Sequence, residues 1–66
     1  MQIFVNGDIR EVPEGTSMSA LIEHLGLGEQ RIAVEVNAEL VPRSQFGGRR
    51  LAPDDRIEII RAVGGG

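Results

Sequence analysis

The sequence predicts an α+β fold in which one helix packs on one face of a mixed four- or five-stranded sheet. Two observations carry this prediction. Several short segments alternate between apolar and polar residues, which is the period of a half-buried strand. Residues 18–25 instead have apolar residues at helical spacing. A helix of that length is unstable alone, so its apolar face is expected to lie against the sheet.

The first twelve residues predict an antiparallel hairpin. Residues 1–5 alternate in polarity as a strand does. Asn6-Gly7 follows, and this pair is the strongest two-residue signal for a type I′ turn. Residues 8–12 then return as the second strand.

The predicted helix has recognisable ends. Ser17 is the preferred N-cap, since its side chain can accept a hydrogen bond from the first turn. Gly26 follows the last periodic position and suits the left-handed residue that ends many helices. The apolar face at i, i+3, i+4 and i+7 is Met18, Leu21, Ile22 and Leu25.

The second half of the chain predicts three further strands. Residues 31–37 alternate in polarity, and residues 40–41, just before a proline, read as a short edge strand. Residues 44–46 are expected to form one helical turn with Phe46 in the core. Residues 56–63 form the final strand, which is expected to lie beside the first strand in the centre of the sheet.

Strand alternation also predicts the core and a surface patch. Phe4 and Ile60 fall on the face away from the helix, on strands expected to be neighbours. Exposed apolar residues on adjacent strands indicate a surface that docks a partner, although single exposed apolar side chains are common. The expected core residues are Ile3, Val5, Leu21, Ile22, Leu25, Val34, Val36, Ile57 and Ile59.

The chain ends in Gly64-Gly65-Gly66, directly after the final strand. A glycine segment has no Cβ atoms, so it can pass through a channel too narrow for other residues. Its terminal carboxylate is ionised at neutral pH and can act as an oxygen nucleophile towards an activated phosphate. The alternative is a frayed end, as at most termini. The expected division is a folded domain of residues 1–63 and a flexible tail of residues 64–66.

Composition excludes several classes of function. Ten acidic and seven basic residues give a net charge of −3, whereas nucleic-acid binding needs a clustered basic surface. There is no cysteine, and all seven basic residues are arginine, so thiolate and lysine chemistry are absent from the chain. No apolar run reaches the roughly 20 residues that span a bilayer. We therefore expect a soluble, cytoplasmic protein that binds neither nucleic acid nor membrane.

No other group of residues predicts a catalytic or metal site. A solvated His24 is favoured over a metal ligand, since no second histidine and no cysteine accompany it. Asp54 and Asp55 are adjacent in a turn and are expected to diverge. Arg49-Arg50 suits a solvated loop or, less simply, a contact with acidic groups of a partner. No phosphate-binding glycine loop precedes a helix, so any ATP chemistry must be supplied by another protein.

These features resemble the ubiquitin-like β-grasp family, and within it the ThiS sulfur carriers of thiamine biosynthesis. The likeness covers essentially the whole chain. It rests on the chain length, on the run from Val34 to Arg43, on the segment from Pro53 to Ile59 and on the terminal glycines. The small subunit of molybdopterin synthase shares the fold and tail but is usually longer and lacks the Val34–Arg43 run. Gly64 departs from the pattern, since ThiS proteins often have alanine there.

The resemblance implies a carrier that is not itself an enzyme and binds no cofactor. In such proteins a ThiF-like adenylating enzyme uses ATP to activate the C-terminal glycine, here Gly66. A cysteine desulfurase or another donor supplies sulfur to form a thiocarboxylate, and thiazole synthase takes that sulfur for the thiazole ring. Gly65 would lie beside Gly66 in the narrow approach. The alternatives are a carrier for molybdopterin or another pathway, a ubiquitin-like protein modifier, and a plain interaction domain.

Overall fold

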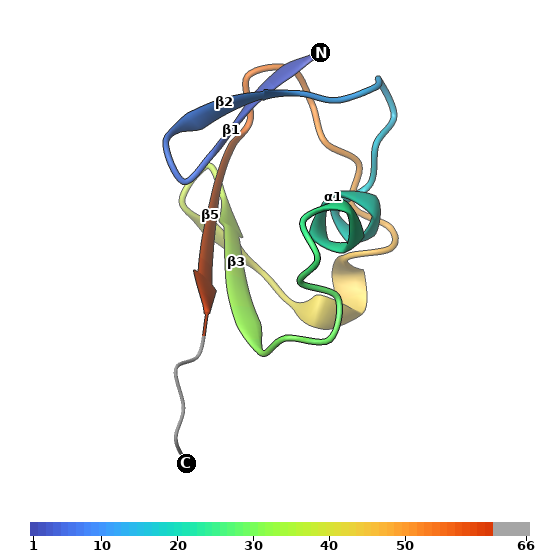
Figure 1. Cartoon of the computed structure of the whole chain (residues 1–66), viewed down its shortest axis with the longest axis vertical. Coiled ribbons are helices and arrows are strands. Elements are labelled where there is room, and N and C mark those ends of the chain that lie inside the picture. The colour runs from blue at the N-terminus through green and yellow to red at the C-terminus, as the bar shows by residue number, and fades with distance from the viewer. Residues whose placement is uncertain (62–66) are drawn as a thin grey trace.

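A computed structural model describes residues 1–61. They form one α-helix, one 3-10 turn and a five-stranded sheet, and α1 lies on one side of that sheet (Figure 1). The strand order is β2-β1-β5-β3-β4, with β1 and β5 parallel and the other pairs antiparallel. The predicted α+β fold is confirmed, with five strands. The elements are β1 (Gln2–Val5), β2 (Asp8–Glu11), α1 (Met18–His24), β3 (Ile32–Val36), β4 (Glu39–Val41), η1 (Arg43–Gln45) and β5 (Arg56–Arg61).

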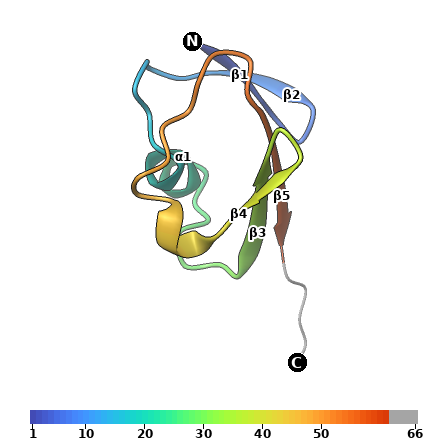
Figure 2. The ribbon, with the colours of Figure 1, turned by 180° about the vertical axis from the view of Figure 1, so that it is seen from behind.

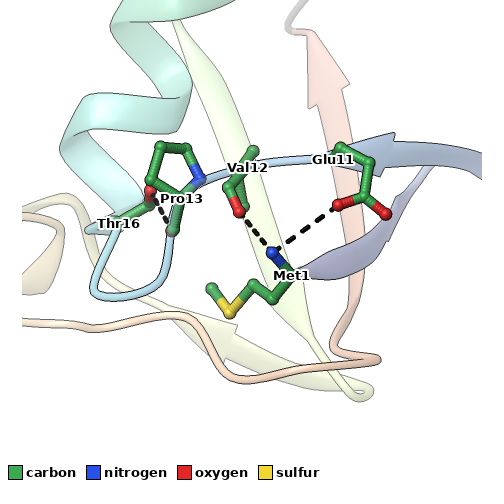
Figure 3. A network of polar contacts seen from close by, with 5 residues as sticks. All are labelled: Met1, Glu11, Val12, Pro13 and Thr16. Carbon is green, nitrogen blue, oxygen red and sulfur yellow. Dashed lines mark hydrogen bonds and ion pairs between the residues drawn. The ribbon is translucent and has the colours of Figure 1, made fainter.

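The β1–β2 hairpin has the predicted turn. Asn6 has a φ of 49° and Gly7 a φ of 86°, and a type I′ turn requires positive φ at both positions. At the open end the Met1 amine donates to the Val12 carbonyl at 2.6 Å (Figure 3). The Val12 N–H donates to the Met1 carbonyl at 2.9 Å. The Glu11 carboxylate lies 3.6 Å from the same amine. The pairing of the two strands therefore continues beyond β1 and β2.

Helix α1 begins at the predicted cap. The chain reaches it through a turn in which the Thr16 hydroxyl donates to the Pro13 carbonyl at 2.6 Å (Figure 3). The Ser17 hydroxyl then accepts a hydrogen bond from the Ala20 N–H at 3.1 Å. This bond satisfies one of the N–H groups that the first turn of a helix leaves unpaired.

The helix ends at a glycine, as predicted. Gly26 has a φ of 75°, and its N–H donates to the Glu23 carbonyl at 2.9 Å. The Leu27 N–H donates to the Ile22 carbonyl at 3.0 Å. These two bonds make up a Schellman motif, which satisfies carbonyls at the end of the helix and turns the chain towards β3.

The β3–β4 hairpin contains a second two-residue turn, formed by Asn37 and Ala38. Both have positive φ, 51° and 71°, although Ala38 is not a glycine. The edge strand β4 confirms the predicted short strand. After it the chain returns through η1 towards α1, as Figure 2 shows. Phe46, directly after η1, is buried in the core as predicted.

The core lies between α1 and the sheet. Of the expected core residues only Leu25 is partly exposed, because it caps the end of α1 at the edge of the cluster. Met18, predicted on the apolar face of the helix, is also buried, as are Val41 and Leu51, for which no core position was predicted. The buried apolar residues are Ile3, Val5, Met18, Leu21, Ile22, Val34, Val36, Val41, Phe46, Leu51, Ile57 and Ile59.

Two predictions concern the limits of the fold. The final strand was expected to extend to residue 63; β5 reaches Arg61, and residues 62 and 63 lie outside the described part of the chain. Within residues 1–61, no helix has the length and apolar character needed to cross a membrane.

Candidate functional site at the end of β5 and on the outer sheet face

The predicted reactive residues Gly64, Gly65 and Gly66 lie outside the described residues, as does the predicted domain boundary after residue 63. The described residues nearest to them belong to β5. The described part of the site is therefore β5 and the sheet surface around it.

Strand β5 is the central strand of the sheet, between β1 and β3. Its pairing with β3 continues to Arg61, which lies opposite Ile32. The Arg61 guanidinium also donates to the Gln30 side-chain carbonyl at 3.4 Å. The segment before the glycines is therefore anchored along the β3 side as far as the last described residue.

On the β1 side the anchoring is different, because β1 ends before β5 does. The regular pairing joins Phe4 and Val5 to Arg56 and Ile57. Beyond it, the Asn6 N–H donates to the Ile57 carbonyl at 2.8 Å. The Asn6 side chain then accepts a hydrogen bond from the Ile59 N–H at 2.7 Å and donates one to the Ile59 carbonyl at 3.3 Å. A side-chain amide thus continues the ladder where the backbone of β1 turns away.

Phe4 and Ile60 are placed on the outer face of the sheet, as their positions in the strand alternation imply. Ile60 is 60% exposed, whereas Phe4 is half-buried, and the Arg56 guanidinium lies 5.0 Å from the centre of its ring. The strands are neighbours, but the register sets Phe4 opposite Arg56. Ile60 is four residues further along β5. Phe4 and Ile60 therefore lie on neighbouring strands of the same face but are not directly opposite each other.

Two other exposed apolar side chains on this face, Ile9 and Leu40, were not predicted from the sequence. Ile9 is 62% exposed and pairs with Phe4 across the hairpin. Leu40 is 68% exposed and pairs with Glu35 on β3. The Asn6-Gly7 turn sets the register of the first hairpin, so it could have identified Ile9 as the neighbour of Phe4.

Charged residues divide the apolar ones on the outer face. Glu35 on β3 lies directly opposite Glu58 on β5. This row separates the Ile9–Phe4 pair at one end from Ile60 at the other. Like charges directly opposite each other in a sheet are unfavourable. The face therefore presents two apolar areas, the Ile9–Phe4 pair and Ile60, with Glu35 and Glu58 between them and Leu40 beside Glu35 on the edge strand.

Of the other residues considered in the sequence, Asp55 and Arg50 make hydrogen bonds within the fold. Asp55 is buried, accepts hydrogen bonds from the Ala52 N–H at 2.8 Å and from the Asn37 amide at 3.0 Å, and does not converge with the exposed Asp54. The Arg50 guanidinium donates to the Gly15 carbonyl at 3.1 Å.

His24 is exposed at the end of α1. The described part of the chain contains no group of three or more histidine, cysteine or acidic residues that could hold a metal ion. Neither His24 nor the acidic residues therefore form an evident metal site within residues 1–61.

Comparison with known proteins decides between families that share this fold. A model of the ThiS family matches residues 3–66, which includes the three glycines. The chain belongs to the ThiS family. The sulfur carrier protein ThiS of Escherichia coli is 27% identical, and the match covers 100% of both chains. The resemblance identified from the sequence is confirmed.

Solved structures and a longer relative add to this assignment. The crystal structure of the thiamine biosynthesis protein ThiS from Geobacter metallireducens has a TM-score of 0.85 and 28% identity, and the match covers 100% of both chains. This likeness confirms the β-grasp fold. A thiazole synthase from Magnetococcus marinus is 36% identical over 66 residues, and the chain spans only 20% of its length. A ThiS-like segment thus forms part of a protein named thiazole synthase.

Proposed function

We propose that this ThiS-family chain carries sulfur on its C-terminal residue for the thiazole ring of thiamine. The observation that carries the proposal is the family match, which extends through the terminal glycines. In the first step the Gly66 carboxylate attacks the α-phosphorus of ATP, and pyrophosphate leaves. The product is an acyl-adenylate, a mixed anhydride whose carbonyl carbon is open to attack by sulfur.

In the second step a persulfide from the sulfur donor attacks that carbonyl, and AMP leaves. A thiol then cleaves the S–S bond of the resulting acyl disulfide by thiol–disulfide exchange, which releases the thiocarboxylate on Gly66. The thiocarboxylate sulfur is the nucleophile passed on to ring formation. The chain itself has no cysteine to serve as the donor or as the reducing thiol.

The chemistry of both steps is proposed to be supplied by partners. The sequence contains no phosphate-binding glycine loop and no lysine to accompany one. We therefore assign the chain the role of a protein substrate, which binds no cofactor of its own. Its partners are a ThiF-like adenylating enzyme that uses ATP, a cysteine desulfurase or other sulfur donor, and thiazole synthase. The ThiS-like segment in a protein named thiazole synthase supports the last of these.

The test is the intact mass of the chain after incubation with the adenylating enzyme, ATP and a sulfur donor. We expect the gain in mass of one oxygen-to-sulfur exchange, located at Gly66 by fragmentation. Gly65→Val is expected to abolish the exchange without changing the fold, since a β-branched side chain would enter the narrow approach. Deletion of Gly66 is expected to abolish it by displacing the carboxylate from the phosphate.

Other outcomes would reassign the function. If the thiocarboxylate supports dithiolene formation and not thiazole formation, the chain is a carrier for molybdopterin. A stable amide to protein lysines, with no thiocarboxylate at any stage, would make the chain a protein modifier and refute the sulfur-carrier proposal.

The outer face of the sheet is proposed as the surface that docks the adenylating enzyme. Ile60 and Phe4 mark its two apolar areas. Ile60→Asp and Phe4→Asp are expected to raise the KM for the carrier roughly tenfold or more, because a charge without a partner is costly in an apolar interface. Ala20→Asp, on the exposed side of α1, is the control. Adenylation of both sheet variants at the parental rate and KM would exclude this face.

A further inference from the structure

Two asparagines hold the backbone of β5 at its two ends in the same manner. At the beginning of β5, the Asn37 side-chain carbonyl accepts a hydrogen bond from the Arg56 N–H at 3.0 Å. Near the end of β5, the Asn6 side-chain carbonyl accepts one from the Ile59 N–H at 2.7 Å. Each asparagine occupies the first position of a two-residue turn with a positive φ.

The side-chain oxygen takes the place of a backbone carbonyl. In a parallel ladder a residue donates its N–H to one residue of the neighbouring strand and accepts from the residue two positions later. The Asn6 N–H donates to the Ile57 carbonyl, so the Ile59 N–H would pair with the Asn6 carbonyl if β1 continued. The chain turns at Asn6 instead, and its side-chain amide satisfies both backbone groups of Ile59.

This contact joins residues that are 53 positions apart, and Ile59 is seven residues before Gly66. Backbone N–H and C=O groups of alternate strand residues point to the same side. Ile59 and Arg61 therefore direct these groups towards the side where β1 has ended. Among the described residues, Asn6 makes the last hydrogen bonds to the backbone on this side of β5. Without it the end of β5 would be held by β3 alone.

We propose that Asn6 is a positioning residue for activation of the C-terminus. By holding Ile59, its side chain fixes the direction in which β5 leaves the sheet, and so the position from which Gly66 reaches the ATP of the adenylating enzyme. This inference rests on the proposed function. Reactions of this kind are sensitive to small displacements of the reacting atom, so a loosened strand end lowers the rate even when docking is intact.

The experiment measures steady-state adenylation of the full chain by pyrophosphate release, with the carrier as the varied substrate. Asn6→Gly removes the amide and keeps a residue that accepts a positive φ. We expect kcat to fall about tenfold or more with KM for the carrier unchanged. Asn6→Asp keeps the acceptor for the Ile59 N–H and loses the donor, and is expected to recover part of kcat.

Asn37→Gly is the matched control. It removes a comparable side-chain amide from a comparable turn, but at the end of β5 remote from Gly66. Asn37→Gly is expected to lose at least as much stability as Asn6→Gly, because it also removes a hydrogen bond to the buried Asp55, whereas only Asn6→Gly lowers kcat. Amide hydrogen exchange provides an independent readout: protection is lost at the Ile59 N–H in Asn6→Gly and at the Arg56 N–H in Asn37→Gly.

The outcomes separate this inference from the function on which it rests. If the parent chain is not adenylated, the proposed function fails. If the parent chain is adenylated and Asn6→Gly matches it in kcat, or if Asn37→Gly loses kcat to the same extent, Asn6 has no positioning role. A loss confined to Asn6→Gly, partly recovered by Asn6→Asp, supports it.

Discussion

The two hairpins of the sheet use the same turn with different residues at its second position. The β1–β2 hairpin has Asn6-Gly7 and the β3–β4 hairpin has Asn37-Ala38, all four with positive φ. Glycine adopts this conformation freely, whereas alanine in the left-handed region costs about 1–2 kcal/mol. The second turn is therefore strained in a way that the first is not.

The surroundings of the two turns explain why the strained one is tolerated. The Asn37 amide donates to the buried Asp55 carboxylate at 3.0 Å, and its carbonyl oxygen accepts from the Arg56 N–H. Asp55 in turn accepts a hydrogen bond from the Ala52 N–H at 2.8 Å. Both turns thus make tertiary contacts through the side chain of their asparagine, but only the first also has a glycine at its second position. The second turn has Ala38 there and depends on its contacts to offset the strain.

The largest expected loss of stability comes from a residue of β5 that lies beside both hairpins. Ile57 on β5 lies beside Val5 of the first hairpin and Val36 of the second, and it is only 1% exposed. Ile57→Ala is expected to lower the free energy of unfolding by about 2–5 kcal/mol. Urea denaturation measures this, with Leu21→Ala, on the buried face of α1, as a comparison in the same range. A loss below 1 kcal/mol would contradict a core centred on β5.

An intermediate loss of stability is expected when the side-chain network around the second hairpin is broken. Asp55→Ala leaves the Ala52 N–H and the Asn37 amide without their acceptor, at a cost of about 1–3 kcal/mol. Hydrogen exchange should increase around Asn37 and remain parental around Asn6. The control is Asp54→Asn, since Asp54 is exposed and asparagine tolerates its positive φ of 66°. If hydrogen exchange increased equally around Asn37 and Asn6, the network would not hold the second turn specifically.

The smallest expected change in stability has opposite signs at the two turns, and it tests the strain at Ala38 directly. Ala38→Gly is expected to stabilise the protein by about 0.5–1 kcal/mol, because glycine relieves the strain and loses some of that gain to backbone entropy. Gly7→Ala is expected to destabilise it by about 1 kcal/mol. A Cβ at Gly7 would have nothing within 4 Å, so conformation and not crowding sets the cost. Thermal unfolding of both variants and the double variant measures the difference.

The sequence by itself determined those features that depend on neighbours along the chain. The Asn6-Gly7 turn, the Ser17 cap, the Gly26 end of α1 and most of the core follow from local conformational preference and from periodicity. The family resemblance followed from runs of residues in the same way, and the match over residues 3–66 confirmed it.

Only the tertiary structure decided which distant residues meet. The parallel register of β1 and β5 sets Phe4 beside Arg56 and away from Ile60, and it brings the Asn6 amide to Ile59. No local pattern encodes this register, because it depends on how the whole sheet packs against α1. Ala38 shows the same limit. Its residue type argues against a left-handed turn, and contacts made by its neighbour Asn37 outweigh that preference.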